Sequence, residues 1–597
     1  MTHPAPHLNP RTMAEAQRHL VAKALAEFAH ERLLAPVRVD GATAADDVSG
    51  TYEVALADRT VVYRFRAQQL RLEHWAIDEA SLTRTVDGVP RMLDASELVV
   101  ELQPLLEIPD ALLATYLEEI AATLAAAAYK IHQGGPSALE LLTADLQTVE
   151  SAMTEGHPGF VANNGRIGFG LDAYERFAPE VGRPFSLQWV AVRREVSHLA
   201  IGDGLDETSL YEGELDAEER ARFASRLTDQ GLDPAAYRLL PVHPWQWDTR
   251  LAITFAPDVA RCDLVPLGPG ADAYQAQQSI RTMFNLSRSD RHYVKTALAI
   301  QNMGFLRGLS PAYMRHTPAI NDWVAALVGA DPTLAACQFE VLRERASIGY
   351  TGDVYHRTST PSAHRKMVAA LWRESPVPRL GADERLATMA SLLHRDRDGH
   401  AYATAMIRAS GLSADVWVAQ YLHAYLRPVV HCLLAHDLAF MPHGENVILV
   451  IADHVPRRAL MKDVGEEVVV LRDRDLPEEV SRIRQPVDAD EQALAIFTDV
   501  FDGVLRHLAG ILHVDGVLPE SRFWALVAEC VDRHAAEHPG LAPRVDLRAD
   551  RFAHSCLNRL QLRNTLQMVD LASQSDSLIY AGTLANPIAR SAVAVPA

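Results

Sequence analysis

Residues 51–77 read TYEVALADRTVVYRFRAQQLRLEHWAI, and this stretch places the chain in a fold class. Apolar and polar residues alternate within TYEVALA, TVVYRFRA and QLRLEHWAI, with short polar turns between the runs. Alternation with a period of two is typical of strands with one buried face, so the stretch predicts an antiparallel meander. Helical patterns flank it, with Asn9-Pro10 as a typical helix start and residues 95–150 helical throughout. We therefore predict an α+β unit at the N-terminus.

Strand-like runs and helices continue to mix farther along the chain. Residues 155–310 contain several strand-like runs, residues 311–445 are predicted to be mostly helical, and residues 490–570 are helical again. The strand-like runs are FSLQWVAVRRE, RLLPVHPWQWD, QQSIRTMFNLS, HYVKTALAI, VILVIA, RRALMKD and EEVVVLR. The last three predict a small antiparallel sheet between two helical regions.

The composition is that of a globular protein with several domains. The chain has 597 residues, 48% of them hydrophobic and 22% charged, and its net charge is −20. This length predicts two to four domains. The acidic balance argues against general binding to nucleic acid or to an anionic membrane, because both need a basic face. A local group of cations is then informative, since it works against the field of the whole protein.

The cysteines and the first residues favour a cytoplasmic protein. The five cysteines are widely spaced and form no C-x-x-C pair, which favours reduced thiols over disulfides or a zinc framework. The opening MTHPAPHLNPRT lacks the apolar core of a signal peptide. We find no run of about 18 uncharged apolar residues, the length that predicts a membrane span. We expect a cytoplasmic location and no membrane partner.

The stretch EGHPGFVANNGRIGFG, residues 155–170, is the first candidate for a functional loop. Its glycines and His157-Pro158 indicate turns and not a helix. Its paired amides, Asn163 and Asn164, precede one cation, Arg166. The loop exposes backbone and offers amide and guanidinium groups to a ligand.

A second candidate is the predicted hairpin SIRTMFNLSRSDRHYVKTALAI, residues 279–300. With an odd number of residues in its loop, Arg281 and Lys295 fall on one face, opposite or diagonal to each other. Arg307 follows beyond a break at Gly304 that could fold it back. Converging cations with the hydroxyls of Ser279 and Thr282 suit a polyphosphate. The alternative is a solvated basic face of a strand.

A third candidate is MPHGENVILV followed by RRALMKD. His443, Glu445 and Asn446 precede an apolar strand, and Asp463 follows the next strand. Kinase-like folds use a polar loop, two strands and an aspartate to hold Mg²⁺ against nucleotide phosphates. Oxygen atoms of Asn and Asp are suitable ligands for this hard ion. The alternative is a hairpin with a polar entry loop.

Two further motifs carry weaker signals. His243 in PVHPWQWD stands beside two tryptophans and is interpreted as a hydrogen-bonded core histidine. In HSCLNRLQLRNTLQMVD, Arg559 and Arg563 are four residues apart and share one face of a predicted helix. A surface face is the default interpretation, and a face that closes over an acidic substrate is the alternative.

Taken together, the blocks EGHP…NNGRIGFG, PVHPWQW, SIRT…K…R, PHGEN…KD and NRLQLRN resemble one family in order and content, over about residues 155–570. They resemble the siderophore synthetases that work independently of nonribosomal peptide synthetases, the IucA/IucC family. Their wording is most similar to the desferrioxamine synthetase branch.

The resemblance implies a cupped, three-part α+β fold of thumb, fingers and a kinase-like palm, usually as a homodimer. We expect the thumb over residues 1–154, the fingers with the nucleotide-contacting loop and the phosphate-binding hairpin over 155–345, and a mostly helical palm with a small antiparallel sheet over 346–597. The implied activity is ATP-dependent adenylation of a carboxylate, which forms AMP, followed by amide formation with an amine. Small-molecule carboxylates and amines are then the partners, and ATP and Mg²⁺ the cofactors.

The family's site residues, carried onto this sequence, follow the same blocks. The resemblance implies that the catalytic residues are Lys295, Arg307 and His443, and that Arg307, His443 and Arg559 bind the acyl or amine substrate. It implies Mg²⁺ ligands among Asp463, Asn446 and Glu445, with Glu466 as an equally suitable acid. The residues implied to bind ATP are His157, Asn164, Arg166, Ser279, Arg281, Thr282, Lys295, Asn446 and Asp463.

One departure bears on the substrate. Relatives that use citrate commonly carry a Thr-Ser-like stretch before the last arginine, whereas Asn302-Met303-Gly304-Phe305 stands there in this chain. The less polar stretch favours a succinyl monoacid, such as an N-hydroxy-N-succinyl-diamine, and a hydroxamate siderophore such as a desferrioxamine as product. The alternatives are a citrate-derived siderophore synthetase of the same family and a kinase-like small-molecule phosphotransferase. Against the latter, Glu445 stands where such kinases have a catalytic aspartate.

Overall fold

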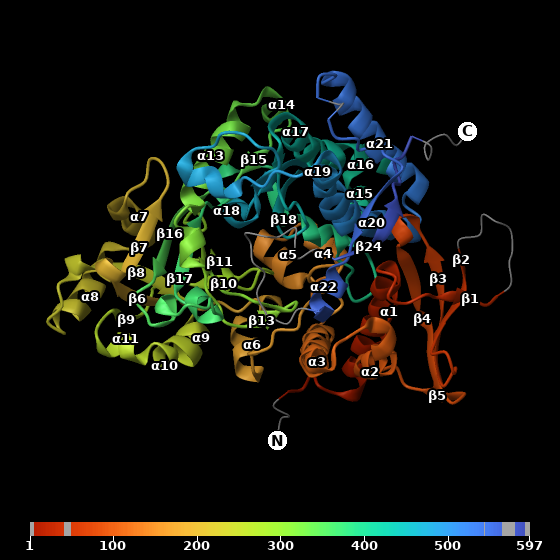
Figure 1. The fold of residues 1–597 in the computed structure, drawn as a ribbon, viewed down its shortest axis with the longest axis horizontal. Coiled ribbons are helices and arrows are strands. Elements are labelled where there is room, and N and C mark those ends of the chain that lie inside the picture. The colour runs from red at the N-terminus through yellow and green to blue at the C-terminus, as the bar shows by residue number, and fades with distance from the viewer. Residues whose placement is uncertain (1–4, 41–48, 542–543, 564–578, 591–597) are drawn as a thin grey trace.

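The computed structural model describes residues 5–40, 49–541, 544–563 and 579–590. Three lobes surround the middle of the molecule: the N-terminal lobe in red and orange, a middle lobe in yellow and green, and a C-terminal lobe in teal and blue (Figure 1). Helices and mainly antiparallel sheets occur together. The predicted α+β class is therefore confirmed.

The N-terminal lobe packs helices against a five-stranded meander in the order β1-β2-β3-β4-β5. Asn9 caps the first helix by accepting hydrogen bonds from the backbone N–H groups of Arg11 and Thr12. In β3, Tyr63 and Phe65 point into the core while alternate residues face solvent, as the period of two requires. The elements are α1 Pro10–His30, β1 Val37–Arg38, β2 Ser49–Ala55, β3 Val61–Gln69, β4 Trp75–Val86, β5 Val89–Arg91, α2 Ala95–Leu106, α3 Asp110–Gln133, α4 Ala138–Leu141 and α5 Leu146–Ala152.

The middle lobe is built around a six-stranded sheet in the order β10-β11-β12-β17-β16-β7 and a three-stranded sheet in the order β8-β6-β9. Its helices are α6 Leu171–Phe177, α7 Glu207–Glu214, α8 Ala217–Thr228, α9 Pro244–Gln246, α10 Ala252–Thr254 and α11 Ala256–Ala260. Its strands are β6 Gln188–Arg193, β7 Ser197–Ile201, β8 Tyr237–Val242, β9 Leu264–Pro269, β10 Tyr274–Ala276, β11 Thr282–Asn285, β12 Tyr293–Thr296, β13 Gln301–Asn302, β14 Phe305–Leu306, β16 Glu344–Tyr350 and β17 Ala369–Arg373.

The C-terminal lobe is mainly helical around a four-stranded sheet in the order β15-β21-β20-β18. Its helices are α12 Pro311–Met314, α13 Thr317–Ala330, α14 Pro332–Ala336, α15 Tyr402–Ser410, α16 Ala414–Ala424, α17 Leu426–His436, α18 Val464–Glu467, α19 Ala489–Ile496, the π-helical η11 Phe497–Leu505, α20 Arg506–Val514, α21 Glu520–Glu537 and α22 Leu557–Arg563. Its strands are β15 Glu340–Val341, β18 Arg385–Thr388, β19 Leu438–Ala439, β20 Val447–Ala452, β21 Val455–Met461, β22 Val469–Val470, β23 Arg551–Ser555 and β24 Tyr580–Ala585.

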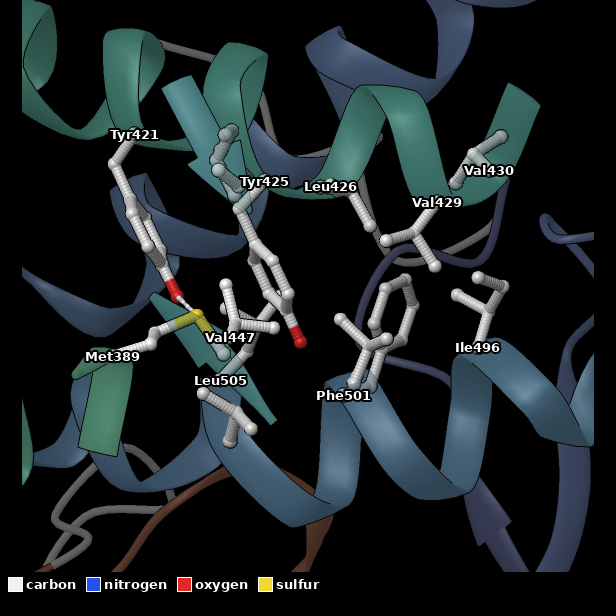
Figure 2. Packing of buried hydrophobic residues seen from close by; sticks show 14 of the residues in the cluster. Met389, Tyr421, Tyr425, Leu426, Val429, Val430, Val447, Ile496, Phe501 and Leu505 are labelled. Atoms are coloured by element: carbon white, nitrogen blue, oxygen red, sulfur yellow. Dashed lines mark hydrogen bonds between the residues drawn. The ribbon is translucent and has the colours of Figure 1, made fainter. Parts of the chain in front are cut away.

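The largest hydrophobic core lies in the C-terminal lobe. Figure 2 shows the side chains of α16 and α17 facing those of α19 and η11, with Val447 of β20 between them. Tyr421 is fully buried and its hydroxyl donates to the Met389 sulfur at 3.4 Å. This dense packing gives β20 and the loop before it a rigid support.

The structure differs from the sequence-based elements at several places. The predicted helical stretch 311–445 also contains β16, β17 and β18. Every residue of β16 and β17 is buried, so neither strand shows the alternation that marks a strand with one solvated face. The run QLRLEHWAI contains a short 3₁₀ turn, and β4 begins only at Trp75.

Three further differences concern the runs RLLPVHPWQWD, EEVVVLR and 490–570. In the first, β8 ends at Val242 and α9 follows. In the second, α18 comes first, and the short β22 pairs with β19 and not with the sheet of β20 and β21. In the third, β23 interrupts the helices and pairs with β24. The pairing of β22 with β19 and of β23 with β24 depends on long-range partners that local pattern does not contain. Helix α9, in contrast, begins for a local reason, since His243 caps it and Pro244 is its first residue.

The hydrophobic cores cut across the predicted boundaries at residues 154 and 345. Helices α4 and α5, from the expected thumb, contribute Leu141 and Val149 to the core of the C-terminal lobe. Helix α13, from the expected fingers, contributes Ile320 to the same core. The boundary at 345 divides β16, and β17 lies beyond it. Both strands nevertheless belong to the sheet of the middle lobe.

Helix α3 is long and apolar enough to cross a membrane by length and composition. It packs against α1, and Tyr116, Ile120 and Leu124 belong to the core of the N-terminal lobe. It also carries the buried Glu119, which accepts hydrogen bonds from Gln301 and Gln561. This packing favours a core helix over a membrane span.

Candidate active site

Two neighbouring hollows share Gly156 and Glu445 as lining residues. The larger hollow has a volume of about 290 Å³ and the smaller one about 40 Å³. The larger hollow takes residues from the N-terminal lobe, the loop 155–170 and the C-terminal lobe. The smaller is lined by Gly156, Asn163, Asn164, Gln278, Ser279, Ile280, Arg281, Asn302, Met303, Arg307 and Glu445. Three of the predicted sequence blocks therefore meet at one place.

The loop 155–170 is held by Asn558 of α22. The Asn558 side chain donates to the Gly159 carbonyl at 2.7 Å and accepts from the Val161 N–H at 3.0 Å. Gly165 is required by a close approach, because a Cβ atom there would lie 2.8 Å from the backbone of Glu119. The loop is thus fixed from α22 on one side and α3 on the other.

Arg166 supports the loop and does not line either hollow. Its guanidinium forms a buried ion pair with Glu180 and donates to Asn164 Oδ1 at 3.2 Å. Asn164 itself lines the smaller hollow. In this structure Arg166 positions Asn164, and its contact with ATP stays a prediction.

A buried group of opposite charges links the middle lobe to α18. Lys295 Nζ lies 2.6 Å from Asp463 Oδ1 and 2.9 Å from Glu466 Oε2. Arg281 reaches the same Glu466 oxygen at 3.1 Å, and Arg373 lies 3.2 Å from Asp463 Oδ2. Arg281 and Lys295 do converge, although β11 pairs Thr282 and not Arg281 with Lys295.

These contacts set the protonation of the group. Burial alone lowers the pKa of Lys295, but Asp463 and Glu466 raise it well above its usual value. Burial alone raises the pKa of Glu466, but Lys295 and Arg281 bring it down to about 2. Both side chains are therefore charged at neutral pH.

Arg307 differs from these cations because it forms no ion pair within the described chain. It lines the smaller hollow, where one guanidinium nitrogen donates to the Asn302 carbonyl at 3.0 Å. Its Nε is buried, and the described residues offer it no hydrogen-bond partner. Burial and the nearby Arg281 lower its pKa to about 10. The charges of Glu445, Glu467 and Glu119 act on Arg307 from a distance, but none of them forms an ion pair with it. A half-buried cation without a direct counter-ion is costly, and an anionic ligand would relieve that cost.

The residues predicted to hold Mg²⁺ lie around α18. Asp463 has left-handed backbone angles (φ 60°, ψ 32°), an unusual conformation for a residue other than glycine and one that clusters at functional sites. Asn446 donates through Nδ2 to Glu467 and to the Met441 carbonyl, which leaves its Oδ1 for a cation. Burial and the nearby Asp463 raise the pKa of Glu467 to about 8. This set of oxygen donors fits a hard divalent ion.

The rings of His157 and His443 lie edge to face, with their centroids 5.6 Å apart. Both residues line the larger hollow, as Glu445 does. Burial lowers the pKa of both rings, so both are neutral at pH 7. Nδ1 of His157 accepts the Gly159 N–H at 3.2 Å, and Nδ1 of His443 accepts the Glu445 N–H at 3.3 Å. A neutral ring that accepts at Nδ1 carries its proton on Nε2. Both rings are therefore hydrogen-bond donors toward a ligand.

The remaining predicted residues divide into two groups. Ser279 lines the smaller hollow, and Thr282 is fully buried beside it with its hydroxyl 3.3 Å from that of Ser279. Arg559 lies elsewhere: it donates to the carbonyls of Glu31 and Arg32, at 3.2 Å each. The structure thus gives Arg559 a role in docking α22, and it does not bring Arg559 to either hollow. Asn564, on the same predicted helix, lies outside the described residues.

Sequence reasoning missed most of the larger hollow. Four histidines line it in addition to the two above: His19, His74, His394 and His507. They come from α1, the turn before β4, the segment after β18 and α20, so no local motif groups them. Arg373 and Glu467 were also missed, although a charged residue that ends the apolar run AALWR of β17 is a usable signal.

Comparison with known proteins shows which family profiles and which relatives this chain resembles. The profile described as "IucA / IucC family" matches residues 145–394, and one described as "Ferric iron reductase FhuF-like transporter" matches residues 415–570. The chain is 45% identical to a putrebactin synthase of Shewanella sp. (strain MR-4), over 98% of this chain and 93% of that protein. It is 31% identical to an aerobactin synthase of Escherichia coli, over 89% of this chain and 90% of that one.

A solved structure agrees over nearly the whole chain. The aerobactin synthetase IucC from Klebsiella pneumoniae superposes with a TM-score of 0.83 at 29% identity, covering 97% of this chain and 99% of that one. The matched profile includes the loop 155–170 and the hairpin with Arg281 and Lys295. The likeness therefore extends to the elements that line the smaller hollow.

Proposed function

Because the chain belongs to the IucA/IucC family of siderophore synthetases, we propose that it adenylates the succinyl carboxylate of an N-hydroxy-N-succinyl-diamine with ATP. The acyl adenylate then reacts with an amine to form an amide. The family relationship makes the chain an enzyme that forms amide bonds in siderophore biosynthesis. The identity to a putrebactin synthase supports a hydroxamate product built from succinyl-diamine units.

The observation that carries this proposal is the half-buried Arg307, which lines the smaller hollow with Asn164, Ser279 and Arg281 and forms no ion pair within the described residues. A carboxylate is inert to an amine until one of its oxygens becomes part of a good leaving group. Arg307 can hold the carboxylate with one edge of its guanidinium and a phosphate with the other. Arg281 and Lys295, once they exchange their acidic partners for phosphate, stabilise the charge on departing pyrophosphate.

The proposed reaction has two steps, adenylation of the carboxylate and transfer of the acyl group to the amine. A carboxylate oxygen attacks the α-phosphorus of ATP, and the bond from that phosphorus to the β-phosphate oxygen breaks, releasing pyrophosphate. The ammonium group first gives a proton to the Glu445 carboxylate, and the free amine nitrogen then bonds to the acyl carbon while the bond to the AMP oxygen breaks. The second proton that this nitrogen loses passes to solvent. His443 and His157 donate hydrogen bonds from Nε2 to the oxygens that gain charge in these steps. Asp463, Glu466, Glu467 and Asn446 would hold Mg²⁺, which neutralises phosphate charge when bound.

The larger hollow suits the carbon chain of the diamine. Its apolar wall includes Ile77, Leu393, Ile511 and Val514, and histidines complete its rim. Such a wall buries methylene groups, while Glu445 at the junction with the smaller hollow can hold an ammonium group until the amine attacks.

The test is to incubate the protein with ATP, Mg²⁺ and a panel of succinyl-hydroxamate amines of different chain length. We expect AMP, pyrophosphate and amide products of defined mass in equal amounts. ADP and phosphate in place of AMP would support the phosphotransferase alternative and overturn the proposal. If the protein formed amides only with citrate as the carboxylate, it would still have the activity of the family, but the proposed succinyl substrate would be wrong.

A further inference from the structure

Four histidines and one aspartate gather where α17 packs against α14 and α21. His431 and His436 belong to α17, His534 to α21, and His538 ends α21. Asp331 lies between α13 and α14 and caps α14. None of the five lines either hollow of the candidate active site. The proposed function therefore gives this cluster no role.

The geometry brings three imidazoles together. His431 Nδ1 lies 3.0 Å from His534 Nε2, and the ring of His538 lies 4.9 Å and 4.8 Å from those two rings, centroid to centroid. Metal-binding atoms of the three side chains all lie within 4.8 Å of one another. His534 and His538 are four residues apart on one helix, a spacing that places two imidazoles on the same face.

Asp331 orients the central ring. Its Oδ2 accepts a hydrogen bond from His431 Nε2 at 3.0 Å and another from His436 Nε2 at 2.9 Å. A carboxylate that takes the Nε2 proton of a histidine leaves Nδ1 with a lone pair, which is the usual arrangement behind a metal-bound histidine. In His431 that lone pair faces His534. The Thr333 hydroxyl lies 3.4 Å from Nε2 of His538, within hydrogen-bond distance. The other nitrogen of this ring, Nδ1, is then available to bind an ion.

The surroundings permit a cation to enter and stay. His534 also lines a separate cavity of about 520 Å³, whose walls come mainly from α21 and from residues 545–548. Arg427, whose charge acts on His534, is paired with Glu537. Arg548 and Arg590, which line the same cavity, are paired with Asp532 and Asp546. Burial lowers the pKa of His534 to about 4 and that of His431 below its usual value, so both rings are neutral at pH 7. Neutral imidazole is the form that binds metal.

We propose that His431, His534 and His538 bind one divalent transition-metal ion, with Asp331 as the group that orients His431. Three imidazole ligands with one open position suit ions of borderline softness such as Zn²⁺ or Co²⁺. They do not suit Mg²⁺, which prefers oxygen ligands. The bound ion would tie α21 to α17.

The experiment uses the full-length protein after treatment with a chelator. Zn²⁺ is titrated calorimetrically in the presence of excess Mg²⁺, and Co²⁺ is followed by its visible absorption. We expect one equivalent of tight binding that Mg²⁺ does not displace, and a visible spectrum typical of four-coordinate Co²⁺. The double variant His534→Gln/His538→Gln should lose this equivalent and keep its rate of amide formation. The variant Asp331→Asn should keep it with about 10- to 100-fold weaker affinity.

A matched control is His400→Gln, because the exposed His400 lies with Asp396 and Asp398 in a separate group that could hold a metal ion. It should leave the tight equivalent unchanged. X-ray absorption at the zinc edge of the wild-type protein tests the ligands without any substitution, and should show scattering from three imidazoles. Absence of a tight equivalent, its persistence in the double variant, or a thiolate-dominated zinc spectrum would each overturn the proposal. None of these outcomes bears on adenylation, which is assayed separately.

Discussion

At the scale of single residues, Arg307 stands apart from the other cations of the site. Lys295, Arg281 and Arg373 share Asp463 and Glu466, whereas Arg307 faces the smaller hollow without an acidic partner in the described chain. Paired cations need an exchange of partners before they bind phosphate. Arg307 is ready to bind an anion as it stands, so we assign it to the acyl carboxylate.

We expect Arg307→Lys to raise KM for the acyl substrate and lower kcat, together by about tenfold or more in kcat/KM. The substitution keeps the charge but loses the planar geometry that holds two anions at once. Apparent affinity for ATP should change less, because Arg281 and Lys295 remain. Steady-state kinetics with each substrate varied in turn measures both effects.

The matched control is Arg281→Lys in the same hollow. Arg281 pairs with Glu466 and is assigned to phosphate, so its conservative variant should mainly affect ATP. If Arg307→Lys were kinetically silent toward the carboxylate, or impaired ATP alone, the assignment of Arg307 would be wrong.

For His443 we expect Ala to slow adenylation about 100-fold, while Gln retains a substantial part of the rate. Removal of one donor to a developing oxyanion usually has an effect of about this size, and the Gln amide can replace the Nε2–H donor. Exchange of labelled pyrophosphate into ATP measures this step. Equal losses in the Gln and Ala variants would argue against a donor role.

The pH dependence of the same step follows from the lowered pKa of His443. A histidine whose folded-state pKa lies below its usual value of about 6.5 is mostly neutral at and above that pH and becomes half-protonated only in more acidic solution. The midpoint of the His443 titration in the exchange rate should therefore lie below pH 6.5. An inflection near 6.5 that disappears in His443→Gln would contradict this assignment.

At the scale of elements, α22 holds the loop 155–170 in place, and α22 is itself held by a residue at the end of α1. Glu31, just after α1, accepts from the N–H groups of Asn558 and Arg559 at 2.7 Å and 2.9 Å, and from the Asn558 side chain at 2.8 Å. Asn558 then holds Gly159 and Val161. One carboxylate therefore positions both the start of α22 and the loop at the active site.

We expect Glu31→Gln to destabilise the protein by about 1–3 kcal/mol, because an amide group would present N–H donors to the N–H donors of α22. KM for ATP should also rise, since the loop loses its fixed position. Thermal unfolding and ATP kinetics give the two readouts. Glu15→Gln is the control on the same helix, because Glu15 is exposed and makes only a 3.6 Å pair with Arg11. If both variants behaved alike, Glu31 would not be the anchor.

At the scale of the whole molecule, the larger hollow exists only where the N-terminal and C-terminal lobes meet. Arg506 of α20 joins them: its guanidinium pairs with Glu27 of α1 at 2.7 Å and with Asp502 at 2.9 Å. It also lies 2.9 Å from His74 Nδ1, ahead of β4. Arg506 and Glu27 are almost completely buried, and Glu27 lines the hollow.

We expect Arg506→Met to lower the free energy of unfolding by roughly 3–5 kcal/mol, because it leaves Glu27 buried without its partner. The double variant Glu27→Leu/Arg506→Met should recover part of this loss, since it removes both charges and their desolvation cost. Thermal unfolding of the two variants beside the wild type measures the difference. If the Glu27→Leu substitution lowered the free energy of unfolding as much in the Arg506→Met background as it does in the wild type, the two residues would not act as a pair.

Local sequence was enough for the features that short-range chemistry controls. The alternation in residues 51–77 gave the meander, Asn9-Pro10 marked the start of α1, and the ordered blocks from EGHP to NRLQLRN led to the family. These signals repeat every two to four residues or lie within one loop, so they can be recognised in the sequence even when the distant contacts are not known.

The partners of each charge could not be read from the sequence, because they come from distant parts of the chain. Lys295 and Asp463 are 168 residues apart, yet their side chains meet at 2.6 Å. Arg166 and Arg559 looked like ligand-binding cations, but folding gave them Glu180 and the carbonyls of Glu31 and Arg32, whereas Arg307 received no acid from the described chain. Strands β16 and β17 were missed because burial on both faces removes alternation. Sequence thus supplied the chemical groups, and tertiary packing determined which of them are neutralised and which remain available to a substrate.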